Sequence, residues 1–484
     1  MPGGVKPPAE AGWQGRIGRG RVWRARRRYD VDHPRNDEAR EMMGKRTRAG
    51  RRAGSPRRER LAFAVLILAA VALMGNLLWL GRTDSLDTAI YRCYAHAFWD
   101  GPRMLHAADT RVCVALWSEP PRQFHTFPHE YPALALAVFS LPLLLPGVPY
   151  TAGFMAWMGA IMLGTTGWLI RRGQVEAAAA LVLYSLLAGW VFTLQRFDLL
   201  AGLSVLSALV LAQRGRLRTA AALLALATLL KLFPVVLLPF LLIAGRRGEA
   251  GRWRWDVVAV FLAVCGIGVL PELLLNPSAL WSPIHYELAR PLQIESLPGS
   301  LIWAGSGMPA GPVIGGDGPR VVFSYYSLSV VGGAQLFWGM LAAAIGVVGM
   351  VMAYGRAWTR RDTLGRSFEL AILVLMVSGK VLSPQYILWI LPVVAVVEGI
   401  RVRWLLLCGL VCLITYFYRI EPAGLQFDRS FMATVLARNG LLCGLMAVYA
   451  FGAGDSGKGG ASGCGRMVGT DRLRPGVRDV LKHR

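Results

Sequence analysis

The sequence predicts an all-α protein, a polytopic bundle of membrane-spanning helices whose extracytoplasmic loops carry short amphipathic helices. Of its 484 residues, 54% are hydrophobic and only 17% are charged, and the mean hydropathy is +0.43. A soluble protein of this length would carry more charge and shorter apolar runs. Several apolar runs here approach the length of about 20 residues that a hydrocarbon core about 30 Å thick requires. The net charge of +24 lies largely in tails and short loops, so we expect no nucleic-acid partner.

The chain is expected to divide into one membrane domain and two basic tails. Residues 1–60 are rich in Arg, Gly and Pro and lack apolar periodicity, which predicts a disordered cytoplasmic tail near anionic headgroups. Met42 or Met43 is an alternative first residue. The basic, Gly-rich segment 452–484 predicts a second disordered cytoplasmic tail, and residues 61–451 then form the membrane domain.

The expected number of spans is 10–12. The run at 61–80 is the first span, because its basic lead-in is too long for a signal peptide. The other apolar runs lie near 132–148, 150–170, 176–194, 199–213, 256–275, 335–354, 367–380, 386–399, 402–418 and 431–451. Two full crossings within 131–170 would place Arg171 and Arg172 outside. Either this pair breaks the positive-inside rule, or the proline-rich run 132–148 does not cross fully.

Residues 219–245 form a special case, because Arg clusters flank them on both sides and they must cross an even number of times. They are too few for two full spans. We therefore expect two short helices that meet at the KLFP sequence, with Lys231 at the turn. Such a broken hairpin is tolerated only where its turn is buried in protein or lines a wet cavity.

The Arg-rich loops are expected in the cytoplasm, which places the segments between them outside. These outer segments are 81–130, the QRFD turn at 195–198, the loop 276–334, KVLSPQY at 380–386, and 419–430. Cys93 and Cys113 share the first of them, where a disulfide and two free thiols are both consistent with the sequence. None of the seven cysteines has metal-ligand spacing.

Polar residues gather on this outer side. Asp84, Asp87, Tyr91 and Tyr94 have helical spacing and would form one stripe of an amphipathic interfacial helix, although a solvated loop with interfacial tyrosines is the simpler alternative. Ionisable residues near membrane depth are costly, so each is a functional candidate unless it snorkels or forms a structural ion pair such as Arg196 with Asp198. The further candidates are Arg196, Asp198, Lys231, Arg290, Glu295, Lys380, Gln385 and Tyr386.

A group of cations with a carboxylate suits a phosphate that is attached to a lipid. Arg binds phosphate through paired hydrogen bonds and Lys binds it as a point charge, while a carboxylate suits a general base acting on a hydroxyl. We therefore expect group transfer from a lipid phosphate to an alcohol. The sequence has no GxxxxGK[ST] loop and no strand–GxGxxG–helix unit, and a nucleotide donor would be on the wrong side of the membrane.

Five motifs, in order, resemble glycosyltransferase family 87 (DUF2029), whose members are integral-membrane enzymes of the GT-C type. The motifs are DTAIYRCYAHAFWDG, EYPAL, the run from RFDLLAGL to KLFPVVLLP, RPLQIESLPGSL and SPQYILWILP, and the resemblance covers 61–450. It implies an inverting, polyprenyl-phosphate-mannose-dependent mannosyltransferase with a lipid or glycan acceptor. The family's D-x-x-x-Y pattern falls on Asp87 and Tyr91. The chain has EYPA where the family often has YPP, and QRFD where it often has GQxN.

The resulting hypothesis makes Asp87 the general base that takes the acceptor proton as the acceptor oxygen attacks C1 opposite the phosphate. Lys231, Arg290 or Lys380 would stabilise the departing polyprenyl phosphate, and Asp84 would be a secondary carboxylate or the base itself. A monophosphate leaving group requires no metal, so we expect neither metal nor cofactor.

The expected location is the plasma membrane, with multiple passes through its lipids, a cytoplasmic N-terminus and an extracytoplasmic active site. Three alternatives stay open: a transporter or lipid flippase, a transferase of arabinose or another lipid-linked sugar, and a non-catalytic scaffold. Transporters tend to show internal repeats, and we find one broken hairpin without a second copy.

Overall fold

The structure, a computed structural model, describes residues 56–80, 85–101, 113, 125–248, 251–305, 320–324, 327–331, 335–359, 361–420 and 429–452. The described residues after Pro56 all belong to one compact unit, Arg57–Arg484. The tails expected at 1–60 and 452–484 lie almost entirely outside the described residues. Helix α2 (Pro56–Leu80) nevertheless begins inside the segment expected to be a disordered tail, because the helix extends beyond its apolar part.

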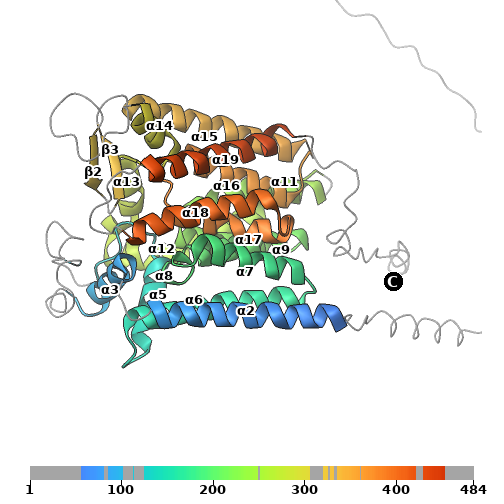
Figure 1. Cartoon of the computed structure of the whole chain (residues 1–484). Helices are drawn as coiled ribbons and strands as arrows, with labels where there is room; N and C mark the ends of the chain where they lie inside the picture. The colour runs from blue at the N-terminus through green and yellow to red at the C-terminus, as the bar shows by residue number, and fades with distance from the viewer. Residues whose placement is uncertain are drawn as a thin grey trace, which may run out of the picture. The chain divides into compact units, whose positions relative to one another are not determined.

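The described part of the chain is an α-helical membrane bundle, as the sequence predicts (Figure 1). Within it, five helices are long and apolar enough to cross a membrane: α2, α6 (Tyr150–Arg171), α12 (Trp255–Leu275), α15 (Gln335–Trp358) and α19 (Arg429–Phe451). Shorter apolar helices accompany them: α7 (Val175–Gly189), α9 (Asp198–Gln213), α10 (Leu217–Leu230), α16 (Leu364–Ser378), α17 (Ile387–Val397) and α18 (Val402–Ile420).

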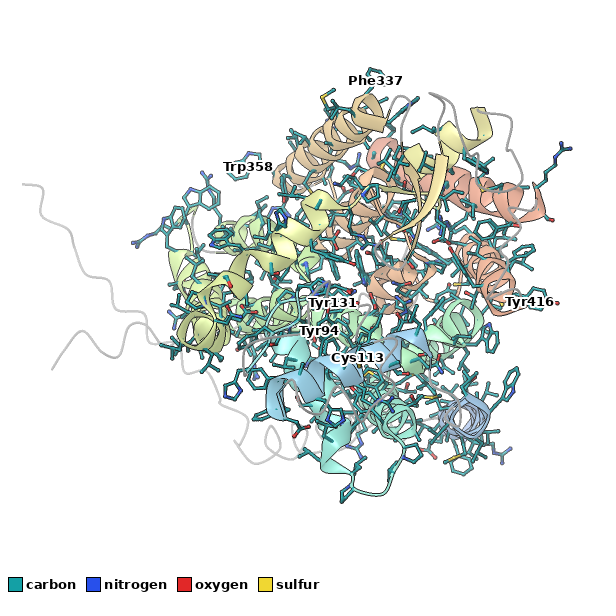
Figure 2. The ribbon with its side chains drawn as sticks, turned by 90° about the vertical axis from the view of Figure 1, so that its left-hand side faces the viewer. Tyr94, Cys113, Tyr131, Phe337, Trp358 and Tyr416 are labelled. Carbon is teal, nitrogen blue, oxygen red and sulfur yellow. A yellow bond between two sulfur atoms is a disulfide. The ribbon has the colours of Figure 1, made fainter. Side chains whose placement is uncertain are left out.

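The long helices α2, α12 and α15 leave most of their apolar residues exposed. Phe63, Ile267 and Phe337 are examples, and Figure 2 shows Phe337 at the rim of the molecule, pointing outward. Apolar surface of this extent is stable in lipid rather than in water. By contrast, the short helices α7, α9, α10, α16 and α17 pack their Ala, Leu and Val side chains into the main hydrophobic core.

Close helix packing brings the start of α9 beside the start of α17. A Cβ atom on Gly202 of α9 would lie only 2.2 Å from the carbonyl oxygen of Leu388 in α17, so the two backbones touch at a position where only glycine fits. This contact sets Asp198, the first residue of α9, beside Trp389 of α17.

The two uncertain regions of the topology are now resolved at the level of helices. Helix α5 (Leu134–Ser140) continues into the 3-10 helix η2 (Leu141–Leu144), and their seven and four residues span only about 20 Å at most, too short for a full crossing. The structure therefore favours the alternative in which 132–148 does not cross fully. The broken hairpin is confirmed: α10 ends at Leu230, and η3 (Phe233–Leu237) leads into α11 (Leu238–Gly248).

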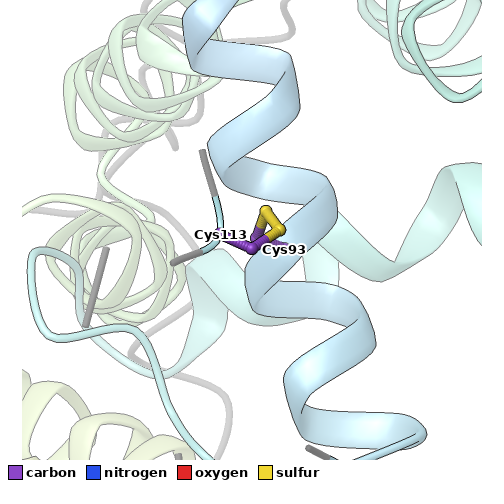
Figure 3. Close-up of a disulfide and its surroundings, with 2 residues drawn as sticks. All are labelled: Cys93 and Cys113. Atoms are coloured by element: carbon purple, nitrogen blue, oxygen red, sulfur yellow. A yellow bond between two sulfur atoms is a disulfide. The ribbon is translucent and has the colours of Figure 1, made fainter. Parts of the chain in front are cut away.

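Short elements connect the helices at the end that carries α3 (Leu86–Trp99), at the left of Figure 1. They are α8 (Phe192–Gln195), η4 (Pro277–Trp281), α13 (Ser282–Ala289), α14 (Leu297–Gly305) and η5 (Pro384–Tyr386). A disulfide joins Cys93 of α3 to Cys113, which decides the alternative that the sequence left open (Figure 3).

A small antiparallel sheet also lies at this end, where the sequence analysis expected only short amphipathic helices. Its strands are β1 (Leu292–Gln293), β2 (Arg320–Ser324) and β3 (Ser327–Val331), in the order β1-β3-β2. Val321 pairs with Val330, and Leu292 pairs with the same residue from the other side. The β-branched valines of the RVVFS and SLSVV segments favour strand over helix, a local signal that the sequence analysis did not use.

Candidate active site

Helix α3 carries the first candidate carboxylate, and three features fix its position. Ser85 caps its N-terminus in a capping box with Thr88, whose hydroxyl also contacts Thr151 of α6 at 2.9 Å. The Cys93–Cys113 disulfide holds the next turn. Asp84 lies outside the described residues, so the expected polar stripe is described for its last three members only.

The alternative of a solvated loop with interfacial tyrosines is wrong for this segment. Tyr91 and Tyr94 are buried, and the Tyr91 ring stacks on Phe139 with ring centroids 4.3 Å apart. Figure 2 shows Tyr94 and Tyr131 in the interior of the molecule. The α3 stripe therefore faces other helices, and Asp87 lies at the edge of this aromatic packing with 21% of its side chain exposed.

Asp87 forms an ion pair with Arg196, whose Nη2 atom lies 2.6 Å from Asp87 Oδ2. Arg196 occupies the extended residue that follows α8, which lets its side chain reach α3. The structural ion pair between Arg196 and Asp198, which the sequence offers as an alternative, is wrong: each residue pairs with one from a different part of the chain. Burial raises the pKa of Asp87, and the Arg196 cation opposes that rise.

Asp198 instead pairs with Lys231 at the turn of the broken hairpin. Lys231 Nζ lies 3.1 Å from Asp198 Oδ1, and the indole Nε1 of Trp389 donates to the same oxygen at 2.8 Å. Four aromatic rings surround the ammonium group at 5.0 to 5.8 Å from their centroids: Phe197, Tyr131, Tyr386 and Trp389. The charge of Lys231 is therefore balanced inside the protein, by one carboxylate and a cage of rings.

Glu130 is a site residue that the sequence analysis missed. Its side chain is only 10% exposed, and Tyr94 donates to its Oε1 atom at 3.4 Å while also contacting His129 Nδ1 at 3.0 Å. Burial raises the pKa of Glu130 to about 7 and lowers that of His129 to about 4. The EYPAL motif was used only for the resemblance, although an ionisable residue directly before an apolar run was itself a signal.

Arg290 and Lys380 lie together on the side of α13. The guanidinium of Arg290 lies 5.4 Å from the Tyr286 ring centroid and 3.6 Å from Glu287 Oε1. Lys380 Nζ donates to the carbonyl oxygens of Leu288 and Arg290, at 2.9 and 3.0 Å. The ammonium group of Lys380 thus fixes the backbone at Arg290 through these two hydrogen bonds, and we do not place it on a ligand.

Glu295 and Gln385 form hydrogen bonds to residues near them in the sequence, and Glu295 also bonds to a helix. Glu295 is buried, its carboxylate accepts from Gln293 Nε2 at 2.8 Å, and its carbonyl oxygen accepts from Arg438 and Asn439 of α19. Gln385 is bonded to Ser383 in the loop before α17. Glu295 therefore contacts α19 and Gln385 contacts its own loop, and neither of these hydrogen bonds involves Asp87.

The expected residues Asp87, Tyr91, Arg196, Asp198, Lys231 and Tyr386 do come together, and Arg290 lies close enough for its charge to act on Glu130. We use the term Asp87 cluster for Asp87, Glu130, Tyr131, Arg196, Asp198, Lys231, Tyr386 and Trp389. Chemically, it offers three carboxyl groups that can accept a proton, and two cations, Arg196 and Lys231, that are each paired with one of them. Within the described ranges, no three His, Cys, Asp or Glu side chains come together as metal ligands.

Comparison with known proteins gives one match. The model of glycosyltransferase family 87 matches residues 129–384, which is more than half of the chain. The matched region contains Glu130, Arg196, Asp198, Lys231 and Arg290, and it begins after α3 with Asp87, so it is narrower than the 61–450 that the motifs suggested. No curated protein and no solved structure matches the chain.

Proposed function

Because the chain belongs to glycosyltransferase family 87, we propose that it moves a mannosyl residue from a polyprenyl-phosphate donor to a lipid or glycan acceptor. The family and the apolar helices establish a multi-pass membrane glycosyltransferase. The proposal adds the sugar, the donor, the inverting stereochemistry, the base and the outer face of the plasma membrane. It also requires the active site to be the end of the bundle that carries α3 and α13.

The observation that carries the proposal is the Asp87 cluster itself. It unites residues from α3, the 129–131 segment, the α8–α9 turn, the hairpin turn and α17, which are far apart in the sequence. Ionisable groups near membrane depth are expensive to bury, and a family of lipid-dependent transferases gives them a use. The exposed apolar residues Trp281, Ile284 and Leu288 on and beside α13 would meet lipid next to Arg290.

In the proposed reaction, the acceptor oxygen forms a bond to C1 of the sugar while the bond from C1 to the phosphate oxygen breaks. The bonding electron pair leaves with the polyprenyl phosphate, and the hydroxyl proton passes to Asp87. Arg196 orients the Asp87 carboxylate, and burial makes that carboxylate a stronger base than one in water.

Arg290 is the proposed phosphate ligand. Among the Arg and Lys ion pairs described above, Arg290 with Glu287 is the longest, at 3.6 Å against 2.6 Å for Arg196 with Asp87 and 3.1 Å for Lys231 with Asp198. Its guanidinium can bind two phosphate oxygens at once. Lys380 contributes by positioning the Arg290 backbone, and Lys231 contributes by shaping the aromatic wall.

The test is transfer by the purified full chain in lipid nanodiscs, supplied with polyprenyl-phosphate-mannose and a membrane lipid extract. Mass spectrometry should detect an acceptor heavier by one hexose, and GDP-mannose in place of the lipid-linked donor should give no product. A product with polyprenyl-phosphate-arabinose alone would show that the proposed sugar is wrong. Movement of a solute or lipid across the membrane without any covalent product would contradict the proposal as a whole.

A further inference from the structure

Glu130 differs from the ion-paired carboxylates at its end of the bundle. Asp87, Asp198 and Glu287 each have an Arg or Lys nitrogen within 4 Å. In the part of the chain that the structure describes, Glu130 has none, and its nearest basic group is the His129 ring at 4.0 Å. A carboxylate that is buried without a cation is unstable in its charged form. Such a group is stabilised when it takes up a proton or when a ligand supplies a partner.

The groups that face Glu130 come from its own segment and from three other parts of the chain. Asp87 and Tyr94 approach from α3, His129 and Tyr131 flank it, Lys231 lies at the hairpin turn, and Arg290 with Tyr286 belongs to the α13 side. The cationic charges of Lys231 and Arg290 favour its ionised form, and Asp87 opposes it. Burial outweighs these cations, so that near neutral pH the carboxyl group is divided between its two protonation states.

An anion bound at Arg290 would remove this balance. The phosphate would neutralise the cation that favours ionised Glu130, and it would bring a second negative charge close to the carboxyl group. Two anions in a buried site repel each other, whereas a carboxylic acid can donate a hydrogen bond to a phosphate oxygen.

We propose that Glu130 is a neutral carboxylic acid in the donor complex, so that binding of the donor phosphate beside Arg290 takes up a proton at this residue. This inference rests on the proposed function, because it assumes that a lipid phosphate binds at Arg290. It makes Glu130 a donor-binding residue that senses pH, distinct from Asp87, which must be ionised to act as the base. Donor affinity is then expected to fall as the pH rises above neutral, since Glu130 must gain a proton before it accepts the phosphate.

The experiment is isothermal titration of the full chain with citronellyl methyl phosphate, an isoprenoid phosphodiester whose single charge does not change between pH 6 and pH 9. Titrations at pH 7.5 in Tris and in HEPES, which differ in ionisation enthalpy, count the protons taken up. We expect about 0.8 proton per ligand for the wild type, because a carboxyl group with a pKa of about 7 is mostly ionised at pH 7.5. Affinity should fall by about tenfold per pH unit at higher pH.

Glu130→Gln should still bind the diester, with an uptake close to zero and an affinity that no longer depends on pH. Glu176→Gln, which makes the same change at an exposed carboxylate on α7, is the matched control and should keep the wild-type uptake. Equal uptake by Glu130→Gln and the wild type would overturn the proposal. If Glu130→Gln does not fold, a wild-type affinity that stays constant from pH 6 to pH 9 would overturn it equally.

These outcomes separate the inference from the proposed function. Binding of the diester by the wild type without proton uptake contradicts the role of Glu130 alone. Failure of the wild type to bind the diester at any pH contradicts the phosphate site itself, and the inference falls with it.

Discussion

Two of the clusters of buried carboxylates and arginines in the bundle are arranged differently. We use the term Glu398 cluster for Arg366, Glu369, Glu398, Arg403, Trp404 and Tyr449. Glu398 accepts hydrogen bonds from Arg403 Nη2 at 2.5 Å and from Trp404 Nε1 at 2.9 Å, and also from Arg366 and Tyr449. Helix α17 (Ile387–Val397) connects the two clusters: it carries Trp389 of the Asp87 cluster near its start and ends at the residue before Glu398.

The two arrangements shift the pKa values of Glu398 and Glu130 in opposite directions. Burial would raise the pKa of Glu398, but hydrogen bonds from Arg403 and Tyr449 outweigh it and lower the pKa. The pKa of Glu130 is raised instead, because burial outweighs its distant cations. Glu398, with its four hydrogen-bond donors, ties together the ends of α16, α17, α18 and α19. Glu130, which has no Arg or Lys partner among the described residues, can instead gain or lose a proton near neutral pH.

The largest expected effect is on stability and belongs to the Glu398 cluster. Glu398→Ala would leave two arginines, an indole and a phenol without their common acceptor. Removing one partner from a buried charged network costs about 3–5 kcal/mol of the free energy of unfolding. Thermal unfolding of the purified protein should therefore show a clearly lower midpoint, while the transfer rate of the folded fraction changes less than twofold. Glu176→Ala, an exposed Glu→Ala change on α7, is the control.

If Glu398→Ala instead left the midpoint unchanged and abolished transfer, the assignment of the two clusters would be reversed. The Glu398 cluster would then contain the reacting groups, and the Asp87 cluster would serve to hold the helices together.

A smaller effect on stability is expected at the other end. Cys113→Ser removes the disulfide that closes a chain segment of 20 residues onto α3. A loop of this length corresponds to about 3 kcal/mol in the chain-entropy description. Hydrogen exchange should increase in α3 and leave α16 unchanged, and transfer should fall because α3 carries Asp87. Uniform protection in both helices would show that α3 needs no covalent support.

Substitution of Arg290 and of Lys231 should affect donor affinity to different extents. Arg290→Ala should raise the KM for the lipid-linked donor by about tenfold, equivalent to about 1.4 kcal/mol. Lys231→Ala should change the KM less than threefold, because Asp198 and the aromatic cage already balance its charge. A larger KM effect for Lys231→Ala than for Arg290→Ala would move the phosphate to the hairpin turn.

Hydropathy and the Arg distribution were sufficient to predict the helices, because both report the environment of each residue directly. Each expected apolar run falls on a helix, and the break at Lys231 follows from the spacing of the Arg clusters. The sheet of β1, β2 and β3 was not predicted, since its strands are short and their pairing depends on chain segments distant in sequence. That α5 is too short to cross a membrane could not be predicted from the sequence, because it depends on where the helix begins and ends.

The candidate site was predicted as a list of residues but not as a set of partners. Charge at membrane depth selected Asp87, Arg196, Asp198 and Lys231, and these do form two ion pairs. Their closeness in the sequence suggested that Arg196 pairs with Asp198. Arg196 is, however, the extended residue that follows α8, and its side chain reaches Asp87 on α3 instead. Trp389 and its bond to Asp198 could not be foreseen, because that contact depends on the packing of α9 against α17 at Gly202.

The most direct test of the account is the single-turnover transfer rate of Asp87→Asn in nanodiscs. We predict a rate lower by about 10²–10⁴-fold, the usual contribution of a general base. The thermal midpoint should fall less than in Glu398→Ala, because the amide oxygen can still accept a hydrogen bond from Arg196. Asp256→Asn, the same change in an ion pair at the start of α12, should transfer at the wild-type rate. Wild-type transfer by Asp87→Asn would contradict the account, and loss of transfer in Asp84→Asn instead would assign the base to Asp84.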